Sequence, residues 1–182
     1  MNAYEQKPWL AQYSAGVPAN ATPAFDNALE MFRAACAQDP ARTQIYYFDT
    51  AISVAEIDRL SDQLAVALRA RGVTKGDRVA VYLQNVPQFV LAMLAAWKAG
   101  AIMVSVNPML RHKEVSLILK DSGAKGLITL ESLYHEVASA VVGETAVAFV
   151  LTTSELEFTG PDRPGLLKDA RRLDCPGAGR PS

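Results

Sequence analysis

The sequence predicts an α/β fold, in which a parallel sheet is covered by helices on both faces. Strand-like and helix-like segments alternate between residues 43 and 151. Helix boundaries are marked by local signals, with Ser53 and Pro87 at expected starts and Gly72 and Gly100 at expected ends. Strands that alternate with helices imply right-handed crossovers, and therefore a parallel sheet.

The clearest single element is a helix that begins at Ser53 and ends at Gly72. Ser53 and Glu56 have the spacing of a capping box, and glycine suits the left-handed end of a helix. Asp58 and Asp62 lie early and basic residues lie late, which matches the helix dipole. One side of this helix is apolar and is made of Ile57, Leu60, Leu64 and Leu68.

The other elements follow from the same kinds of signal. Phe25, Leu29, Phe32 and Cys36 recur at helical spacing, Pro87 suits a first helical turn, and Gly123 suits a helix end. Further helices are expected at 24–38, 87–99, 111–122 and 132–142. Strands are expected at 43–48 (with a turn into Ile52), 78–83, 102–106, 126–130 and 146–151. Residues 1–23 are expected to form an extended arm, residues 24–151 the α/β subdomain, and residues 152–182, where periodicity fails, an irregular and disordered tail.

Composition excludes several classes of protein. A chain of 182 residues suits one domain and hides roughly 70% of its unfolded surface. The net charge of −1 gives no basic face for nucleic acid. The apolar stretch 86–106 is interrupted by Pro87, Lys98 and Gly100, so no transmembrane segment is expected, and the N-terminus does not read as a signal peptide. Two cysteines, Cys36 and Cys175, form no disulfide framework, so we expect a soluble, cytoplasmic protein.

No motif for catalysis or metal binding stands out. The sequence lacks a GxGxxG after a strand, a GxxxxGK[ST] phosphate loop and a GxSxG elbow. Near His112 and His135, the only residues that could share a metal ion with them are Glu114 and Glu136. Both histidines are therefore interpreted as exposed helix residues. We therefore assign no catalytic and no metal-binding residue.

A few other residues admit two interpretations. The run 121–123 is interpreted as a helix end rather than as a catalytic serine site. The aromatic run 46–48 forms either a binding surface or, as favoured here, a hairpin whose rings pack on the neighbouring helix. Trp97 is interpreted as a core residue. Lys98 lies near a helix C-terminus, where the dipole and solvent exposure explain it, but a lysine beside a glycine stop can also contact a phosphate.

The run from Ile52 to Leu130 resembles the front of the AMP-forming acyl-CoA synthetases, the adenylate-forming ligases. Each matching piece is weak alone, and their order and spacing carry the resemblance. They are Ser53-Val-Ala-Glu-Ile57, Gly72-Val-Thr-Lys-Gly-Asp-Arg-Val-Ala80, Leu83-Gln-Asn-Val-Pro87, Trp97-Lys-Ala-Gly-Ala101, Asn107-Pro108, Glu114 and Asp121-Ser-Gly-Ala-Lys125. The Asn107-Pro108 pair is more similar to the fatty acyl or aryl CoA ligases than to the peptide synthetases, and we favour the long-chain fatty acyl-CoA ligase branch.

The resemblance implies a reaction and its cofactors. Family members use ATP and Mg²⁺ to convert a carboxylic (fatty) acid to an acyl-adenylate, which then reacts with coenzyme A. The family's phosphate loop (TSGTTGxPKG), its YGxTE element and its C-terminal lysine do not occur here, so no cofactor is expected to bind to this chain alone. By resemblance, Lys98 matches a basic residue that contacts the 3′-phosphate of coenzyme A in some members.

Three hypotheses follow for function. The first is an N-terminal ligase fragment that is inactive alone. The second is a non-enzymatic truncated paralogue that pairs with a full-length ligase, and the third is a free-standing nucleotide-binding domain. A truncated subdomain would also carry an exposed apolar face, which predicts self-association.

Overall fold

A four-stranded parallel sheet forms the centre of the protein in the computed structural model, which describes residues 2–160. Its strand order is β4–β3–β5–β6, and every pairing is parallel. The strands are β3 (Arg78–Tyr82), β4 (Ile102–Ser105), β5 (Gly126–Leu130) and β6 (Phe149–Thr153). The predicted fold class is therefore confirmed, although β6 lies slightly further along the chain than expected.

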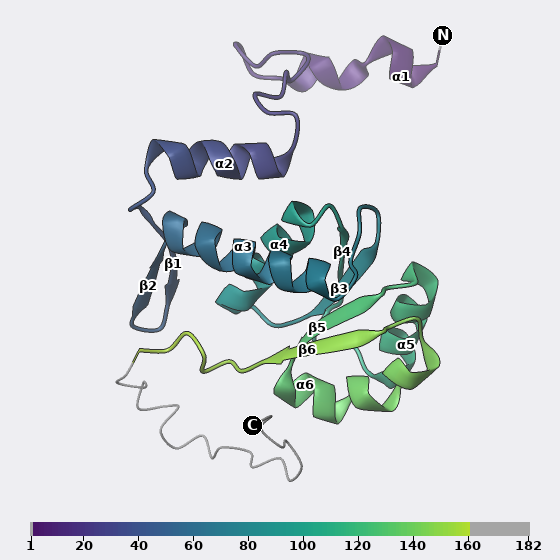
Figure 1. The fold of residues 1–182 in the computed structure, drawn as a ribbon. Coiled ribbons are helices and arrows are strands. Elements are labelled where there is room, and N and C mark those ends of the chain that lie inside the picture. The colour runs from purple at the N-terminus through teal and green to yellow at the C-terminus, as the bar shows by residue number, and fades with distance from the viewer. Residues whose placement is uncertain (1, 161–182) are drawn as a thin grey trace.

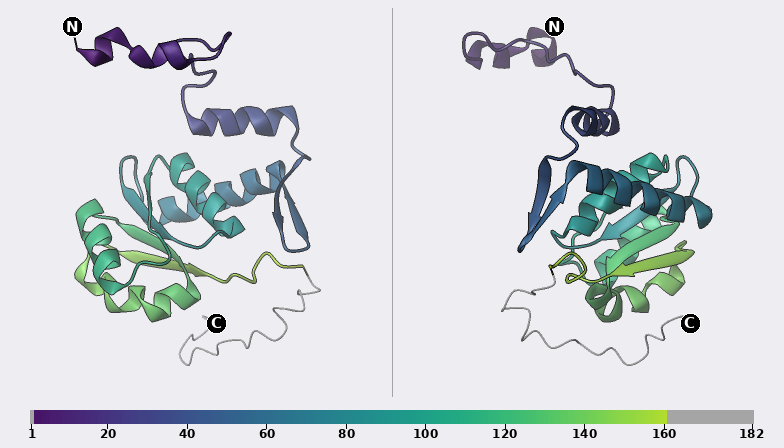
Figure 2. Two further views of the ribbon diagram at one scale, coloured as in Figure 1. Left: turned by 180° about the vertical axis from the view of Figure 1, so that it is seen from behind. Right: turned by 60° about the vertical axis from the view of Figure 1, so that its left-hand side comes forward.

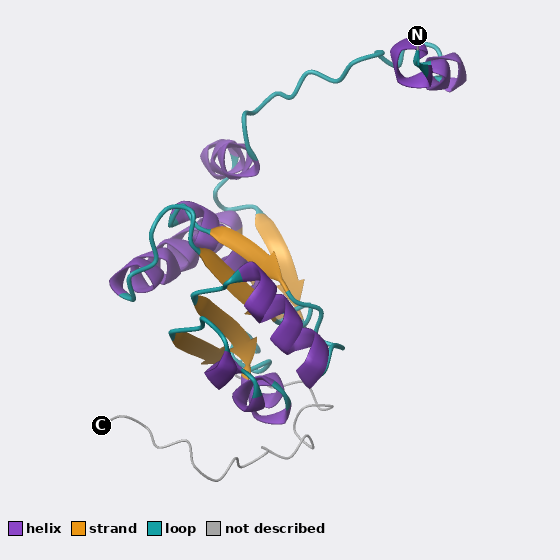
Figure 3. Ribbon diagram, turned by 90° about the vertical axis from the view of Figure 1, so that its right-hand side faces the viewer, coloured by secondary structure: helices purple, strands orange, loops and turns teal. Residues whose placement is uncertain are grey.

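Helices cover both faces of this sheet (Figure 1). On one face lie α3 (Val54–Ala70) and α4 (Pro87–Lys98), and on the other lie α5 (His112–Ser122) and α6 (Glu131–Glu136). Figure 3 shows the same layers from the side. The expected helix 132–142 is shorter than predicted, because it breaks at Val137 into two 3-10 turns, η2 (Ala138–Ala140) and η3 (Val142–Glu144). Valine, serine and glycine in this stretch are weak helix formers.

The boundaries of α3 and α4 follow their predicted signals. Ser53 Oγ accepts a hydrogen bond from the backbone N–H of Glu56 at 3.2 Å, and Gly72 takes a left-handed φ of 82° after α3. Gly100, with φ of 79°, follows α4 and lies 3.4 Å from the backbone of Lys75 at the point where a Cβ would stand. Only glycine fits this turn without strain. The small side chains of α4 let it pack closely, and Ala92, Ala95 and Ala96 are fully buried.

The N-terminal part stands away from the sheet (Figure 2). The expected extended arm contains two short helices, α1 (Ala3–Gln6) and η1 (Pro8–Gln12). The next helix, α2 (Ala28–Gln38), begins later than predicted because Asn27 caps it by accepting from the N–H of Glu30 at 2.9 Å. Phe25 therefore precedes the helix and is exposed.

A hairpin of β1 (Thr43–Tyr47) and β2 (Thr50–Ser53) connects α2 to α3. The expectation that its three aromatic rings pack on a helix was wrong for two of them. Tyr46 is 78% exposed and Phe48 is 52% exposed in a left-handed turn, whereas Tyr47 packs against the core and donates to the carbonyl of Glu155 at 2.9 Å. Side chains alternate along a strand, so neighbouring rings cannot all face inward.

None of the helices between residues 2 and 160 combines the length and the apolar character that a bilayer crossing requires. The last residues of the expected tail, 161–182, and Cys175 lie outside the described part of the chain. The disorder expected there stays a prediction.

Candidate functional site

The carboxyl end of the sheet is the edge at which parallel α/β proteins carry their ligand-binding loops. The chain leaves β3 towards α4 on one face and leaves β5 towards α6 on the other (Figure 1). Ligands of parallel α/β sheets bind outside the carboxyl ends of strands, where neighbouring connections diverge in this way. The loop after β3 lies at this divergence, and on its other side it borders the loop after β4, so the polar residues of these two loops are candidates for binding.

A cavity of about 510 Å³ lies between these two loops. Its polar lining consists of Gln84, Asn85, Ser105 and Asn107, and none of its lining residues has an ionisable side chain. The loop after β4 is held in place, because Tyr82 Oη donates to the carbonyl of Leu110 at 2.7 Å. Such a cavity can bind amide or hydroxyl groups but supplies no general acid or base.

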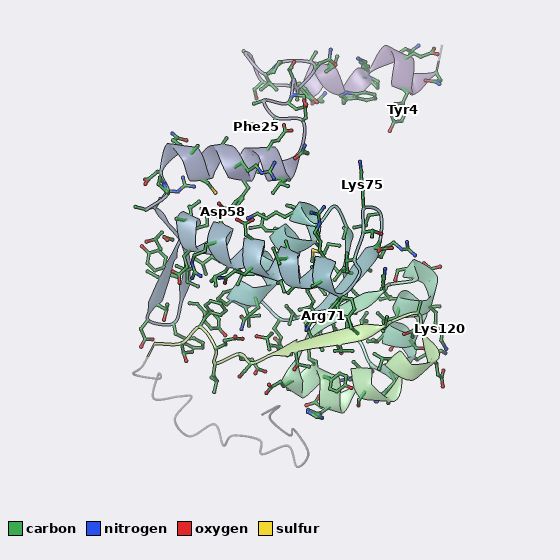
Figure 4. The ribbon with its side chains drawn as sticks, in the orientation of Figure 1. Tyr4, Phe25, Asp58, Arg71, Lys75 and Lys120 are labelled. Carbon is green, nitrogen blue, oxygen red and sulfur yellow. The ribbon has the colours of Figure 1, made fainter. Side chains whose placement is uncertain are left out.

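Lys98 lies elsewhere, in the last turn of α4. Its Nζ is 2.6 Å from Asp58 Oδ1, 2.8 Å from Asp62 Oδ1 and 2.9 Å from the carbonyl of Asp58. The Phe32 ring of α2 lies 5.8 Å away, and Figure 4 shows Asp58 on α3 in the direction of α2. The Lys98 side chain is 6% exposed, so the expected solvent exposure was wrong. The Lys98 ammonium thus links α4 to α3 through ion pairs and lies close to a ring of α2.

The same cluster affects Cys36 on α2. Burial is the main cause that raises the pKa of the Cys36 thiol, and the nearby Asp58 carboxylate raises it further. A raised pKa favours the protonated thiol, which is a weaker nucleophile than the thiolate. This geometry therefore describes a structural thiol beside an ion pair and gives no sign of a nucleophile.

The two histidines and the run 121–123 occupy the places expected of them, whereas Trp97 is only half-buried and packs beside the cluster of Ile57, Leu91 and Leu94. His112 and His135 are exposed on α5 and α6. Ser122 Oγ donates to the carbonyl of Ile118 at 2.7 Å, and Gly123 takes a left-handed φ of 57°, so this run is a helix end. Within residues 2–160, no three His, Cys, Asp or Glu side chains are grouped to hold a metal ion.

The sequence motifs did not single out one buried polar residue, Gln88. Gln88, in the first turn of α4, is 7% exposed, and its Nε2 donates to the Ser154 carbonyl at 2.8 Å and to Thr153 Oγ1 at 3.0 Å. Its Oε1 is buried and has no hydrogen-bond partner among the described residues. Its sequence signal was a glutamine within an apolar helix directly after Pro87.

Fold and loops together define a parallel α/β unit whose loops at the carboxyl edge of the sheet are the candidates for ligand binding. Residues 32–173 match the AMP-binding enzyme family, and the chain belongs to this family. The resemblance inferred from the motifs between Ile52 and Leu130 is thereby confirmed.

Three comparisons indicate which members it is similar to. The chain is 34% identical over 130 residues to a long-chain-fatty-acid–CoA ligase of Bacillus subtilis, a match that covers 71% of this chain and 23% of that ligase. It is 30% identical over 150 residues to one of Escherichia coli O6:H1, covering 81% of this chain and 27% of the relative. The crystal structure of a long-chain-fatty-acid-CoA ligase from Archaeoglobus fulgidus superposes with a TM-score of 0.67 at 26% identity, covering 81% of this chain and 32% of the other. The chain thus spans about a quarter of the length of these curated relatives.

Proposed function

We propose that this chain provides the N-terminal part of an ATP-dependent, AMP-forming fatty acyl-CoA ligase, and that it does not catalyse the reaction alone. The observation that supports the proposal most is the ordered set of family motifs between Ile52 and Leu130, mounted on a parallel sheet that superposes on a long-chain ligase. We infer a fatty acid as the substrate because the relatives are long-chain-fatty-acid–CoA ligases.

The proposed reaction explains why this part cannot act by itself. A carboxylate oxygen is a poor leaving group until it is joined to AMP, and the charge of the phosphates must be held during that step. ATP with Mg²⁺ would supply the adenylyl group, and coenzyme A would accept the acyl group. The residues described here build the sheet, its crossovers and the loops at its carboxyl edge, so their role is to support groups that act on the phosphates.

ATP–pyrophosphate exchange with the purified 182-residue chain tests the proposal. A series of saturated fatty acids is supplied with ATP and Mg²⁺, and the Bacillus subtilis ligase serves as the active control. We expect exchange with the control and none with this chain. Exchange that co-elutes with this chain through two different chromatography steps would refute the claim of inactivity.

Contact between Lys98 and the 3′-phosphate of coenzyme A stays a prediction. The three donors of the ammonium already meet three acceptors, so a phosphate must replace Asp58 or Asp62. Calorimetric titration with coenzyme A and with its 3′-dephospho form measures this contact. We expect neither ligand to bind measurably to this chain alone, because Asp58 and Asp62 already occupy the ammonium. Binding of coenzyme A but not of its 3′-dephospho form, lost in Lys98→Gln, would establish the contact.

A second function, as partner of another ligase chain, is favoured by one observation. Among residues 2–160, an apolar groove beside β6 is left open.

A further inference from the structure

A second cavity lies beneath α2, and we call it the α2–α4 cavity. Its volume is about 520 Å³, within the range of about 300–1,000 Å³ that is usual for sites of small organic molecules. Its walls come from α2, β1, the start of α3 and one side of α4, and α2 lies over α3 and α4 (Figures 1 and 2). The lining residues are Ala28, Met31, Phe32, Ala35, Arg42, Gln44, Val54, Ile57, Val90, Met93, Leu94 and Trp97. None of them lines the cavity at the carboxyl end of the sheet.

The helix α2 does not fill the space beneath it. None of its eleven residues is buried. Leu29 and Phe32 are only half-buried, although they pack beside the cluster of Ile57, Leu91 and Leu94. Apolar walls that face empty space lose dispersion contacts, and a bound apolar group would restore them.

The lining of the α2–α4 cavity suits a flexible hydrocarbon chain. Apart from Arg42 and Gln44, every residue of the lining is apolar. Met31 of α2 and Met93 of α4 stand on two of the walls, and methionine side chains adapt to ligands of different shape. Trp97 also lines the cavity and is half-buried, so a ligand there changes the surroundings of its indole ring.

One cation lies where the cavity opens to solvent. In the described part of the chain, Arg42 is the only ionisable residue of the lining, and Arg42 and Gln44 are both exposed. Arg42 Nη2 donates to Gln44 Oε1 at 3.2 Å, which holds the guanidinium beside β1. Among residues 2–160, Arg42 forms no ion pair. A planar guanidinium matches the two oxygens of a carboxylate, so Arg42 is the candidate for binding an anionic head.

Lys98 does not compete for that role, although it lies close to the cavity wall. Its Nζ is 5.8 Å from the centre of the Phe32 ring, but it is already paired with the carboxylates of Asp58 and Asp62. Two carboxylates beside one ammonium leave an excess of negative charge there, which repels an anion. The charges around the cavity therefore favour an anionic head at Arg42.

We propose that the α2–α4 cavity binds an alkyl carboxylate, with its hydrocarbon chain between α2 and α4 and its carboxylate on the Arg42 guanidinium. This site goes beyond the ligase function proposed above and does not depend on it. Its chemistry comes from the apolar lining and from a cation that has no carboxylate partner within residues 2–160.

The fluorescence of Trp97 measures binding in a Trp9→Phe background, because the chain then contains no other tryptophan. The 182-residue chain is titrated with sodium decanoate below its micellar concentration, without ATP and without coenzyme A. We expect a saturable shift of the emission. Octanoate should bind roughly tenfold more weakly, because two fewer methylene groups are buried. The absence of a saturable change with decanoate would refute the site.

Two alanines of α2 test where the ligand lies. Ala35 lines the cavity, whereas Ala37 is exposed on the same helix and does not line it. Calorimetric titration, which does not depend on Trp97, compares the two variants. Ala35→Leu should weaken decanoate binding at least tenfold because the added side chain occupies the cavity, and Ala37→Leu should leave it unchanged. If circular dichroism shows that Ala35→Leu is unfolded, Val90→Phe fills the same space from α4. Equal affinities of the filling variant and Ala37→Leu would refute the proposal.

Arg42→Gln tests the contact with the anionic head. It should weaken decanoate binding by about two- to fivefold, as expected of an ion pair that is open to solvent, and should leave the binding of 1-octanol unchanged. Arg33→Gln is the matched control, because Arg33 is an exposed arginine of α2 that does not line the cavity. Equal effects of the two substitutions on decanoate binding would refute the carboxylate contact.

Sedimentation of the chain tests a different occupant. A dimer that Ala35→Leu dissociates and decanoate does not would show that a second copy fills the cavity, and would refute the proposal. Pyrophosphate exchange by the chain alone would refute the proposed inactivity, whereas decanoate binding is measured without nucleotide. The two proposals can therefore fail separately.

Discussion

Lys98 Nζ lies 2.6 Å from Asp58 Oδ1, which joins the last turn of α4 to the first half of α3 across forty residues of sequence. Asp62 Oδ1 and the Asp58 carbonyl accept the other two donors of the ammonium. A lysine with all three donors satisfied is stable at a site that exposes only 6% of its side chain. This contact joins the two helices that cover one face of the sheet.

Lys98→Met should lower the free energy of unfolding by about 1–3 kcal/mol. The loss stays below that of a fully buried pair, because the Asp58 and Asp62 side chains are 38% and 62% exposed and regain water. Urea unfolding followed by circular dichroism measures it. Lys120→Met is the control, since Lys120 and Glu144 form an exposed pair at 3.0 Å that is worth at most about 1 kcal/mol. Equal losses in the two variants would show that the burial of Lys98 contributes nothing.

Asp77 should govern part of the stability of the protein in acid. Its carboxylate accepts from the Thr74 backbone N–H at 2.8 Å, from Lys125 Nζ at 3.1 Å and from Thr74 Oγ1 at 3.0 Å, which lowers its pKa from 3.8 to about 2. A lowered pKa in the folded state means that the stabilising contribution is complete above 3.8 and is lost as the pH falls through about 2. Asp77→Asn should therefore flatten the pH dependence of unfolding in this range. Urea unfolding at several pH values measures it, and parallel curves for the two proteins would contradict the prediction.

The sequence was sufficient for those elements that carry their own signals. Ser53, Pro87 and the glycines at 72, 100 and 123 mark helix ends through backbone geometry, which depends on neighbours in the chain. The order of strands and helices then restricted the sheet to parallel pairing. For this reason α3, α4, α5 and the four strands lie close to where they were expected.

Features that depend on distant contacts were not accessible in this way. The burial of Lys98 requires Asp58 and Asp62 on another helix, and the unpaired Oε1 of Gln88 is defined by Thr153 and Ser154 at the end of β6. No local pattern contains those partners. The motifs therefore predicted the family to which the chain belongs. They could not predict the groove beside β6.

Gly126 should be intolerant of a side chain. It lies on β5 beside Phe149 of β6, and a methyl group at this position would overlap the Phe149 ring. Gly126→Ala should lower the free energy of unfolding by about 1–3 kcal/mol through overpacking. Gly143→Ala is the control, because nothing lies within 4 Å of a methyl group there. Phe149→Leu should relieve part of the penalty when combined with Gly126→Ala, and a strictly additive double variant would exclude the clash with the ring.

Tyr82 should link the stability of the protein to high pH. It is fully buried, its Oη donates to the Leu110 carbonyl at 2.7 Å, and burial is the main cause that raises its pKa above the ordinary value of 10. A phenol with a raised pKa in the folded state contributes stability below pH 10 that is lost as the pH rises through the folded value. Tyr82→Phe should cost about 1–2 kcal/mol at pH 8, because it removes the donor to Leu110, and should weaken the decline in stability above pH 10. Urea unfolding at pH 8 and above pH 10 measures the loss of stability and the alkaline decline. Tyr46→Phe is the control, because Tyr46 is 78% exposed. An unchanged decline in Tyr82→Phe would assign the alkaline sensitivity to other groups.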